Sequence, residues 1–278
     1  MRRATDVPRQ VLARTADGRR LLTPLADVWG QFVYFLGEYE PGVTEVVRRV
    51  VEPGDVCVDV GANIGWYTTL LQTLVAPGGA VHAFEPLPRS FETLRRNVEL
   101  NESSAAVRLN AVAVGEAEGQ ADLHVFADLP DSHASVSSLG RSDSISSPVR
   151  VTSLDSYLER WGVGEVSFVK MDVEGSELAV LEGAGRLFDQ TRPPIVEIEM
   201  ALATSRHFDH LPNDLIAFMR GRADFEFYSI DEERAVLRPI DGFRDDEVGA
   251  NVLCVPRGAY RDRLARLRVL RPDRRREK

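Results

Sequence analysis

Acidic side chains stand at the ends of four predicted strands, where a folded chain can use them for binding or proton transfer. Asp59, Glu85, Asp172 and Glu199 each come at the end of an apolar run. Ligands of open parallel sheets bind at the carboxyl ends of the strands. A carboxylate at that edge can accept hydrogen bonds from ribose hydroxyls, or can remove a proton as a general base.

The loop after Asp59 predicts a strand, a glycine-rich turn and a helix in succession. The loop contains Gly61, Asn63 and Gly65, and from Ile64 the apolar residues recur with helical spacing. Such a turn lets a ligand approach the backbone closely and offers it unpaired amides at a helix N-terminus. The loop is therefore a candidate cofactor site.

Two residues distinguish between the cofactors that such a loop can bind. A dinucleotide fingerprint needs a third glycine for close helix–strand packing, and that position holds the large Trp66. Asn63 replaces the middle glycine, but asparagine reaches left-handed backbone angles at low cost. Glu85 alone would suit the ribose of either NAD or S-adenosylmethionine (SAM), whereas Glu85 with Trp66 favours SAM. The D-x-G-x-N-x-G spacing resembles the first motif of class I SAM methyltransferases.

Three motifs in order resemble the FkbM family of methyltransferases. They are Asp59-Val60-Gly61-Ala62-Asn63-Ile64-Gly65, Phe84-Glu85-Pro86 and Lys170-Met171-Asp172-Val173-Glu174-Gly175-Ser176-Glu177. The resemblance spans approximately residues 39–256. It implies an α/β, Rossmann-like class I methyltransferase fold: a seven-stranded, mostly parallel sheet with an antiparallel last strand, plus an N-terminal cap. It also implies SAM as cofactor, with S-adenosylhomocysteine (SAH) as product, and O-methylation of a hydroxyl on a small natural product or sugar.

The resemblance also implies a set of cofactor-binding positions. Asp59 and the loop amides would hold the methionine part of SAM, Glu85 the ribose, and Asn110 with Ala111 the adenine. The full expected set is Tyr39, Asp59, Gly61, Ala62, Asn63, Gly65, Glu85, Asn110, Ala111 and Asp172.

Methyl transfer to an alcohol gains from a base, and three residues are the candidates. Asp172 and Glu199 end strands, and His133 lies in a serine-rich segment. A purely positional contact of Asp172 is an equal alternative. His207 and His210 are interpreted as a solvated pair in a polar loop, and no metal site is predicted, although a divalent ion stays open as an alternative to a base. We expect Lys170, in a buried strand, to pair with Glu197 or Glu199.

The chain divides into three regions. Residues 1–50 form an N-terminal segment and an aromatic cap, 51–258 the SAM-binding domain, and 259–278 a basic tail predicted as a short amphipathic helix that frays. The cap, dense in aromatic residues at 29–39, packs on the sheet or also roofs the acceptor pocket, and an exposed cap would suit a homodimer. Eight serines among residues 128–148 indicate either a mobile loop or a lid.

The pattern of apolar runs and turns places the secondary structure. Predicted strands cover approximately 55–59, 80–85, 107–114, 121–126, 149–152, 165–171, 193–199, 226–230 and 250–255; predicted helices cover 43–51, 64–74, 88–100, 155–161 and 214–222. Glu174 and Glu177 fall in the first turn of a further helix, where the dipole stabilises negative charge. Residues 231–248 read as a polar connection.

Composition excludes several classes of partner. No apolar run approaches the ~20 residues of a membrane helix, so we expect no membrane partner and a cytoplasmic protein. The net charge is −9, and residues 261–278 carry nine basic and three acidic side chains, which leaves −15 elsewhere and disfavours nucleic acid. Cys57 and Cys254 are expected as reduced, buried thiols. Two rivals to the methyltransferase interpretation stay open: an NAD-linked oxidoreductase, and a non-catalytic SAM-binding paralogue.

Overall fold

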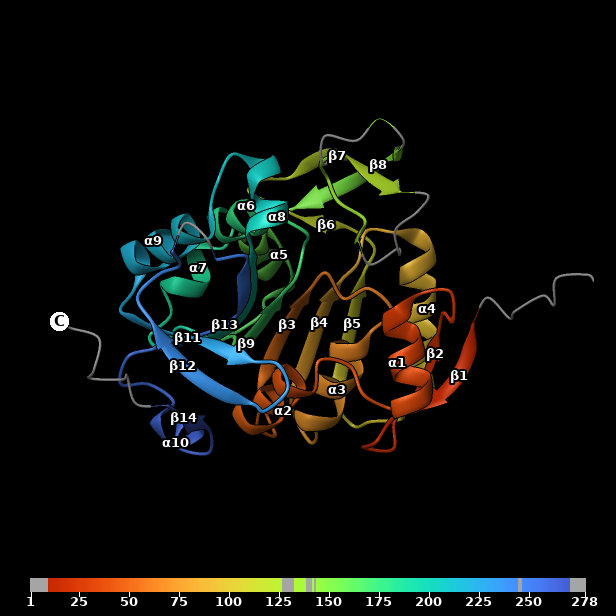
Figure 1. Cartoon of the computed structure of the whole chain (residues 1–278), viewed down its shortest axis with the longest axis horizontal. Helices are drawn as coiled ribbons and strands as arrows, with labels where there is room; N and C mark the ends of the chain where they lie inside the picture. The colour runs from red at the N-terminus through yellow and green to blue at the C-terminus, as the bar shows by residue number, and fades with distance from the viewer. Residues whose placement is uncertain (1–9, 127–132, 139–141, 143, 245–246, 271–278) are drawn as a thin grey trace, which may run out of the picture.

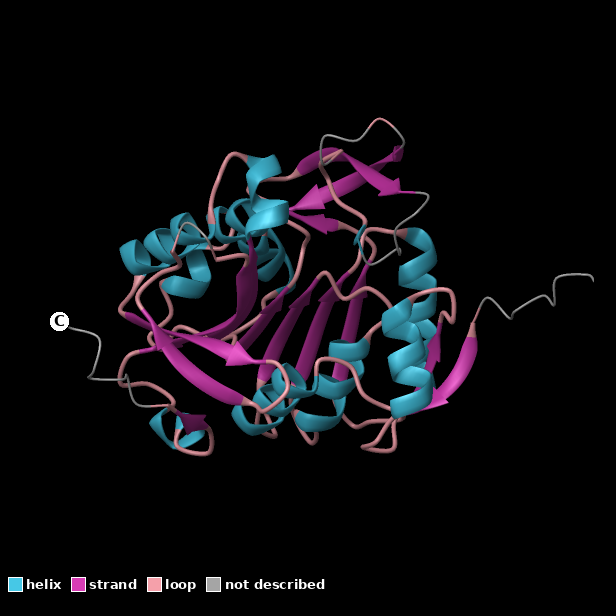
Figure 2. Cartoon of the chain, in the orientation of Figure 1, coloured by secondary structure: helices cyan, strands magenta, loops and turns pink. Residues whose placement is uncertain are grey.

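A nine-stranded sheet with helices on both faces forms the centre of the protein (Figures 1 and 2). The computed structural model describes residues 10–126, 133–138, 142, 144–244 and 247–270. The strand order is β14-β12-β11-β13-β10-β9-β3-β4-β5. The strands are β3 (Val56–Val60), β4 (Ala80–Phe84), β5 (Ala106–Asn110), β9 (Phe168–Met171), β10 (Ile195–Ala201), β11 (Phe225–Asp231), β12 (Val236–Ile240), β13 (Gly249–Pro256) and β14 (Arg268–Val269).

The predicted class of fold is confirmed, and the strand count is larger than predicted. Strands β10, β9, β3, β4 and β5 run parallel, and β13 is antiparallel to both β10 and β11. These seven strands match the predicted mostly parallel sheet with its antiparallel last strand. The sheet then gains β12 and β14 beside β11. The sequence missed β12 because its segment reads as polar, and missed β14 because it is only two residues long.

Two layers of helices cover the sheet. One face carries α2 (Pro41–Val50), α3 (Trp66–Leu74) and α4 (Pro88–Leu100); the other carries α5 (Leu154–Trp161), α6 (Glu177–Glu182), α7 (Gly185–Phe188) and α9 (Pro212–Arg222). The predicted inward face of α2, which is Val46, Val47 and Val50, is buried. Cys57 and Cys254 are buried free thiols on β3 and β13, as predicted.

The order in which the chain adds strands to the sheet changes side at β3. From β3 the chain adds β4 and β5 on one side, and β9 and β10 lie on the other. The carboxyl ends of β3 and β9 therefore flank a topological switch point, where open α/β sheets bind their ligands. The short helix α8 (Leu202–Ser205) follows β10 at the same edge, and a 3₁₀ turn at Arg206–Phe208 comes directly after it.

The N-terminal region is a small hairpin and a helix laid against α3 and α4. Strands β1 (Val11–Arg14) and β2 (Arg20–Thr23) pair antiparallel, and α1 (Val28–Leu36) follows them. Arg19 is buried; its guanidinium lies over the Trp66 ring and donates a hydrogen bond to the Trp66 carbonyl. The hairpin is thus joined to the first turn of α3.

A separate three-stranded sheet rises above the carboxyl edge, as Figure 1 shows. It consists of β6 (Ala113–Val114), β8 (Ser144–Thr152) and β7 (Gly119–Phe126). The predicted strand at 107–114 is therefore wrong as one element: it breaks after Asn110, and Ala113 joins β8 instead. Residues 144–148, predicted as part of a lid or loop, belong to β8. The remaining serine-rich residues lie outside the described ranges, except 133–138 and 142.

The C-terminal segment returns to the start of the central strand. A helix of four residues, α10 (Arg261–Leu264), precedes β14, so the short amphipathic helix predicted through Leu264, Leu267 and Leu270 ends already at Leu264. Arg263 is buried, and its guanidinium donates to both carboxylate oxygens of Asp55, at 2.6 and 2.9 Å, and to the Val50 carbonyl. Residues 271–278 of the predicted tail lie outside the described ranges.

Candidate active site

The loop that joins β3 to α3 needs its small residues for steric reasons. Gly61 has a φ of 82°, and a Cβ there would lie 1.7 Å from the Asp172 carbonyl oxygen. Asn63 also has a positive φ of 47°, which asparagine tolerates better than most residues. The loop therefore packs directly against the end of β9 and joins the first and third motifs.

Glu85 holds the same loop from the side of β4. Its two carboxylate oxygens accept hydrogen bonds from the backbone N–H groups of Asn63, at 2.8 Å, and Leu87, at 2.7 Å. The carboxyl group is buried but lines a small cavity of about 60 Å³. We name this the apolar cavity, since most of its other walls are hydrophobic: Phe84, Pro86, Val112, Ala113, Val114, Leu123, Ala134 and Val136.

A second and larger cavity, of about 500 Å³, begins on the other side of the loop. We name it the acidic cavity because five carboxylates line it: Glu40, Asp59, Asp172, Glu174 and Glu199. The two cavities share Gly61, Asn63, Asp172 and Glu174. A ligand lying across the glycine loop can therefore occupy both.

Lys170, which lines this cavity, forms an ion pair with Glu197 on the neighbouring strand. Lys170 on β9 and Glu197 on β10 are register partners, and Nζ lies 2.9 Å from the Glu197 Oε2. Both side chains are almost fully buried, at 1% and 0% exposure. The predicted cross-strand pair is confirmed for Glu197. Nζ also lies 3.7 Å from Asp172 Oδ2, so the Lys170 ammonium group forms ion pairs with two carboxylates.

The crowding of carboxylates raises several of their pKa values. The charge of Asp172, followed by burial, raises the pKa of Glu199 from 4.5 to about 9. Burial, with the charges of Asp172 and Glu177, raises the pKa of Glu174 to about 8. Burial raises the pKa of Asp59 to about 6, although a hydrogen bond from Thr68 Oγ1 opposes the shift. Glu199 is thus a carboxyl group whose ionised form would be an unusually strong base.

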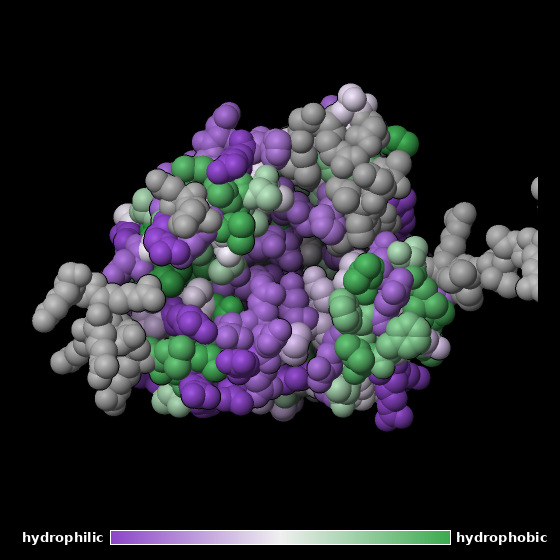
Figure 3. Space-filling model, in the orientation of Figure 1, coloured by the Kyte–Doolittle hydropathy of each residue, from purple (hydrophilic) through white to green (hydrophobic). Residues whose placement is uncertain are grey.

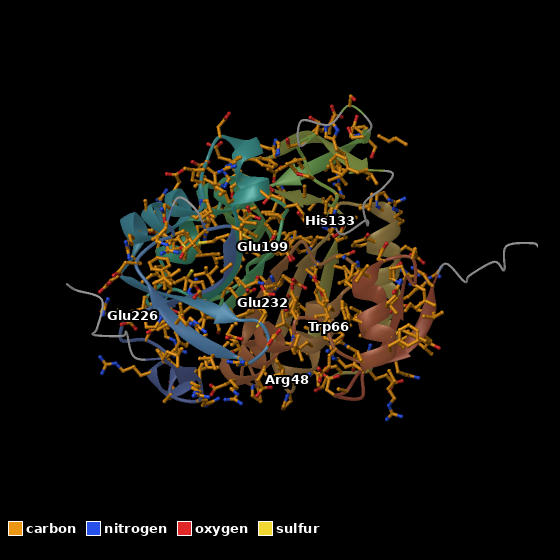
Figure 4. The ribbon with its side chains drawn as sticks, viewed as in Figure 1. Arg48, Trp66, His133, Glu199, Glu226 and Glu232 are labelled. Carbon is orange, nitrogen blue, oxygen red and sulfur yellow. The ribbon has the colours of Figure 1, made fainter. Side chains whose placement is uncertain are left out.

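The cap supplies the remaining wall of the acidic cavity. Trp29 and Phe32 of α1, with Tyr39 and Trp66, line it. Tyr39 packs edge-on against Trp29 and Trp66, with ring centroids 5.8 and 6.0 Å apart. Figure 4 shows Trp66, His133 and Glu199, from three distant parts of the sequence, around the same central region.

Glu40 has a strained backbone at the edge of this wall. Its φ is 43°, although it is not a glycine, and its side chain reaches Tyr67, whose hydroxyl donates to Oε2 at 2.6 Å. Backbone strain of this kind gathers at functional sites, where the surrounding packing holds it. Glu40 therefore lines the acidic cavity beside Tyr39.

A comparison with protein families decides the class of this site. The model of the methyltransferase FkbM domain matches residues 59–227, which is more than half of the chain. The chain belongs to the FkbM methyltransferase family. Membership identifies SAM as the methyl donor and removes the NAD-linked oxidoreductase as an interpretation.

Two curated relatives and one solved structure resemble this FkbM-family methyltransferase at low sequence identity. The chain is 29% identical over 204 residues to 31-O-demethyl-FK506 methyltransferase FkbM of Streptomyces tacrolimicus, covering 63% of this chain and 75% of that protein. It is 29% identical over 160 residues to hexuronic acid methyltransferase AglP of Haloferax volcanii, covering 56% of this chain and 62% of that protein. A solved structure of M. jannaschii TYW2 in complex with AdoMet shares 13% identity at a TM-score of 0.45, covering 88% and 84%.

Most of the residues predicted to bind the cofactor in this FkbM-family protein line one of the two cavities. Glu85 lines the apolar cavity and Gly61, Asn63 and Asp172 line both, while Tyr39, Asp59 and Ala62 line the acidic one. Gly65 lines neither. It adopts a φ of 92° at the start of α3, where a Cβ would lie 2.6 Å from Leu94 Cδ1. Its role in the structure is to let α3 and α4 approach.

The adenine contacts of Asn110 and Ala111 stay predictions. Neither residue lines the apolar or the acidic cavity, and the Asn110 Nδ2 donates to the Ala83 carbonyl at 3.0 Å. Because β5 ends at Asn110, the residues that turn towards the cofactor side come two positions later, beginning at Val112.

The three predicted catalytic residues lie together, and one further acid joins them. Asp172, Glu199 and His133 all line the acidic cavity. Glu174 was predicted in the first turn of a helix, but α6 begins at Glu177, and Glu174 lies in the preceding loop with a φ of 53°. The sequence signal for this turn was the adjacent Gly175, whose φ is 104°.

The histidines of the polar loop differ from the prediction of a solvated pair. His207 is exposed as predicted, whereas His210 is buried at 5% exposure, so the two do not form a solvated pair. In the described parts of the chain, no helix is long and apolar enough to cross a membrane. Within those same ranges no three carboxylate, imidazole or thiol groups converge to hold a metal ion.

Proposed function

We propose that the protein is an O-methyltransferase that transfers the methyl group of SAM to a hydroxyl of a small natural product or sugar. The observation that carries this proposal is the acidic cavity, which places Glu199 and Asp172 beside the glycine loop. The names of the relatives, which describe methylation of demethyl-FK506 and of a hexuronic acid, support an oxygen acceptor.

The residues fit the cofactor on both sides of the glycine loop. Gly61 keeps that loop free of a side chain, Glu85 and the apolar walls suit an adenosine group, and Asp59 suits the methionine end. When bound, SAM supplies an electrophilic methyl group. The walls of Trp29 and Tyr39 would exclude water and orient the acceptor, and such orientation contributes several kcal/mol to catalysis.

Glu199 is the residue we assign as general base. An alcohol holds its proton tightly, so a carboxylate with an ordinary pKa would remove it poorly. The charge of Asp172 raises the pKa of Glu199 to about 9, which makes the ionised Glu199 a better match. The proton of the acceptor hydroxyl would pass to a Glu199 carboxylate oxygen, while SAM, when bound, would supply the methyl group by loss of its sulfur–methyl bond and would leave as SAH. His133 lines the same cavity and is the second candidate.

The test is methyl transfer from radiolabelled SAM to a library of hydroxylated acceptors, with matched amines in the same library. We expect incorporation on hydroxyl compounds, and a Glu199→Gln variant that binds SAH normally but transfers methyl groups 10²–10⁴-fold more slowly. Glu182→Gln, an exposed acid on α6 outside both cavities, is the control and should match the wild type. SAH binding with transfer to amines alone would contradict the oxygen assignment.

Binding of SAH also separates the proposed enzyme from a non-catalytic paralogue. Calorimetric titration of the wild type, Asp59→Ala and Glu85→Ala should show binding that either substitution weakens at least tenfold. Wild-type binding without turnover on any acceptor would favour the paralogue. A folded wild type that does not bind SAH would contradict the cofactor assignment itself.

A further inference from the structure

Helix α1 is strongly apolar, with Gln31 as its one amide side chain, and yet it is mostly exposed. Its sequence, Val28 to Leu36, contains no charged residue, and only Gly30 and Val33 are buried. Helices that are hydrophobic all round are normally enclosed by other parts of a protein. The outer side of α1 therefore lacks a covering layer within the described part of the chain.

Four of its exposed side chains form one continuous line. Val28, Phe32, Phe35 and Leu36 are spaced i, i+4, i+7 and i+8, which places them on the same side of the helix. Their exposed fractions are 65%, 50%, 73% and 63%. We name these four residues the α1 stripe. Tyr34 is 43% exposed, and its ring packs edge-on against Phe35 of the stripe, with ring centroids 5.1 Å apart.

The α1 stripe begins inside the acidic cavity and continues out of it. Val28 and Phe32 line that cavity, together with Trp29, whereas Phe35 and Leu36 do not. At 1.5 Å per residue, the stripe extends about 12 Å along the helix. Figure 3 shows hydrophobic side chains gathered over α1, beside a hollow whose floor is hydrophilic. The hydrophilic floor of the hollow and the hydrophobic α1 stripe beside it thus form one continuous surface.

This continuity identifies what covers the stripe. A ligand that fills the cavity contacts Val28 and Phe32 first, and only a longer ligand reaches Phe35 and Leu36. A flat apolar surface alone would suit many partners, but this one starts at the site of proposed methyl transfer. Its natural occupant is therefore the part of the acceptor that does not fit into the cavity.

We propose that the acceptor is an amphiphile, with a hydroxylated polar head in the acidic cavity and an apolar body along the α1 stripe. The inference rests on the proposed function, since it describes the substrate class of that site. The cavity of about 500 Å³ holds the head, and burial of the exposed Phe and Leu side chains attracts the body. Small polar sugars without an apolar substituent are then poor acceptors.

The experiment compares two ligands that share a head and differ only in their apolar part. Methyl β-glucoside and octyl β-glucoside, the latter below its micelle concentration, are titrated into SAH-saturated protein and followed by tryptophan fluorescence and calorimetry. We expect the octyl compound to bind at least tenfold more tightly. Phe35→Ser and Leu36→Ser should each reduce that preference at least threefold, because both residues lie outside the cavity.

The control is Leu211→Ser, which removes an exposed apolar side chain just before α9, outside both the stripe and the acidic cavity, and should keep the full preference. Equal binding of the two glucosides, or an equal loss in all three variants, would overturn the proposal. A dimer that Phe35→Ser dissociates and that excludes the octyl compound would assign the stripe to a second copy of the chain. Binding to phosphatidylcholine vesicles that Phe35→Ser abolishes, with no octyl preference, would assign it to a lipid surface.

The two levels of the proposal fail separately. Binding of SAH is measured first in the same samples. If SAH binds and the octyl preference is absent, the substrate class is wrong while the methyltransferase assignment stands. If SAH does not bind, the proposed function fails and the amphiphile inference fails with it.

Discussion

Replacement of Lys170 by methionine should destabilise the protein by an amount that depends strongly on pH. The change removes the only cation that lies 2.9 Å from the buried Glu197 among the described residues. Breaking a buried pair by removing one partner typically costs about 3–5 kcal/mol, because the other charge stays behind without compensation.

The loss of stability depends on pH because Glu197 can bind a proton and so lose its buried charge. Burial already raises its pKa from 4.5 to about 7, and the charge of Lys170 opposes that rise. Without Lys170 the pKa rises further, so the folded variant holds Glu197 protonated while the unfolded chain ionises it. That protonation costs about 1.4 kcal/mol for each pH unit above 4.5, which sets a ceiling of about 5 kcal/mol at pH 8 and less than about 1 kcal/mol at pH 5.

The direction in which stability changes with pH follows from the raised pKa of Glu197. A carboxyl group whose folded pKa is raised binds more protons in the folded state, so stability falls as pH rises from its unfolded towards its folded pKa. The wild type, with its Glu197 pKa of about 7, already carries about 3 kcal/mol of this cost at pH 8. Urea unfolding followed by circular dichroism should therefore show Lys170→Met nearly matching the wild type at pH 5 and losing about 1–2 kcal/mol at pH 8. The double variant Lys170→Met/Glu197→Leu should recover most of the loss. A deficit that is equal at both pH values would refute the reasoning and point to lost packing of the lysine stem.

Three further predictions concern the site. Gly61→Ala should lower the melting temperature by many degrees and abolish SAH binding in calorimetry, because its Cβ would meet the Asp172 carbonyl at 1.7 Å; an unchanged melting curve would contradict the packing. Glu85→Gln should cost about 1–3 kcal/mol in urea unfolding, because the amide nitrogen of glutamine cannot accept one of the two backbone N–H groups that Glu85 now binds. In pH profiles, kcat/KM should rise about tenfold per unit below about pH 9, since Glu199 must lose its proton to act as base, and Glu199→Gln should remove this limb. A flat wild-type profile would assign the base to another residue.

The sequence predicted the parts of the site that depend on local geometry. The glycine loop after Asp59 has positive φ angles at Gly61, Asn63 and Gly65, which are residue types that adopt such angles at low cost, so the residue types alone indicated the turn. The Lys170 pair followed from a general cost, since a buried ammonium group requires an acid nearby. The position of β12 had no such signal, because half of that strand is exposed and its residues alternate poorly.

The incorrect predictions arose where a local rule met a tertiary constraint. Glu174 satisfies the rule that acids favour the first turn of a helix, but Gly175 reverses the backbone and turns Glu174 towards the cavity. The strand predicted at 107–114 breaks after Asn110, whose side-chain amide donates to the Ala83 carbonyl and to the Tyr157 hydroxyl. The exposure of α1 was also invisible in sequence, because an apolar helix is ordinarily a buried one.

The bond between Arg263 and Asp55 has a consequence for the order in which the protein can form. The two residues are 208 positions apart, and both are buried in the finished structure. During synthesis the ribosome releases β3 long before Arg263, so Asp55 must wait for its partner while most of the sheet assembles. Domains generally fold as units as they are released, and late contacts of this kind delay completion. The buried ion pair before β3 therefore forms only after the segment that contains Arg263 has left the ribosome.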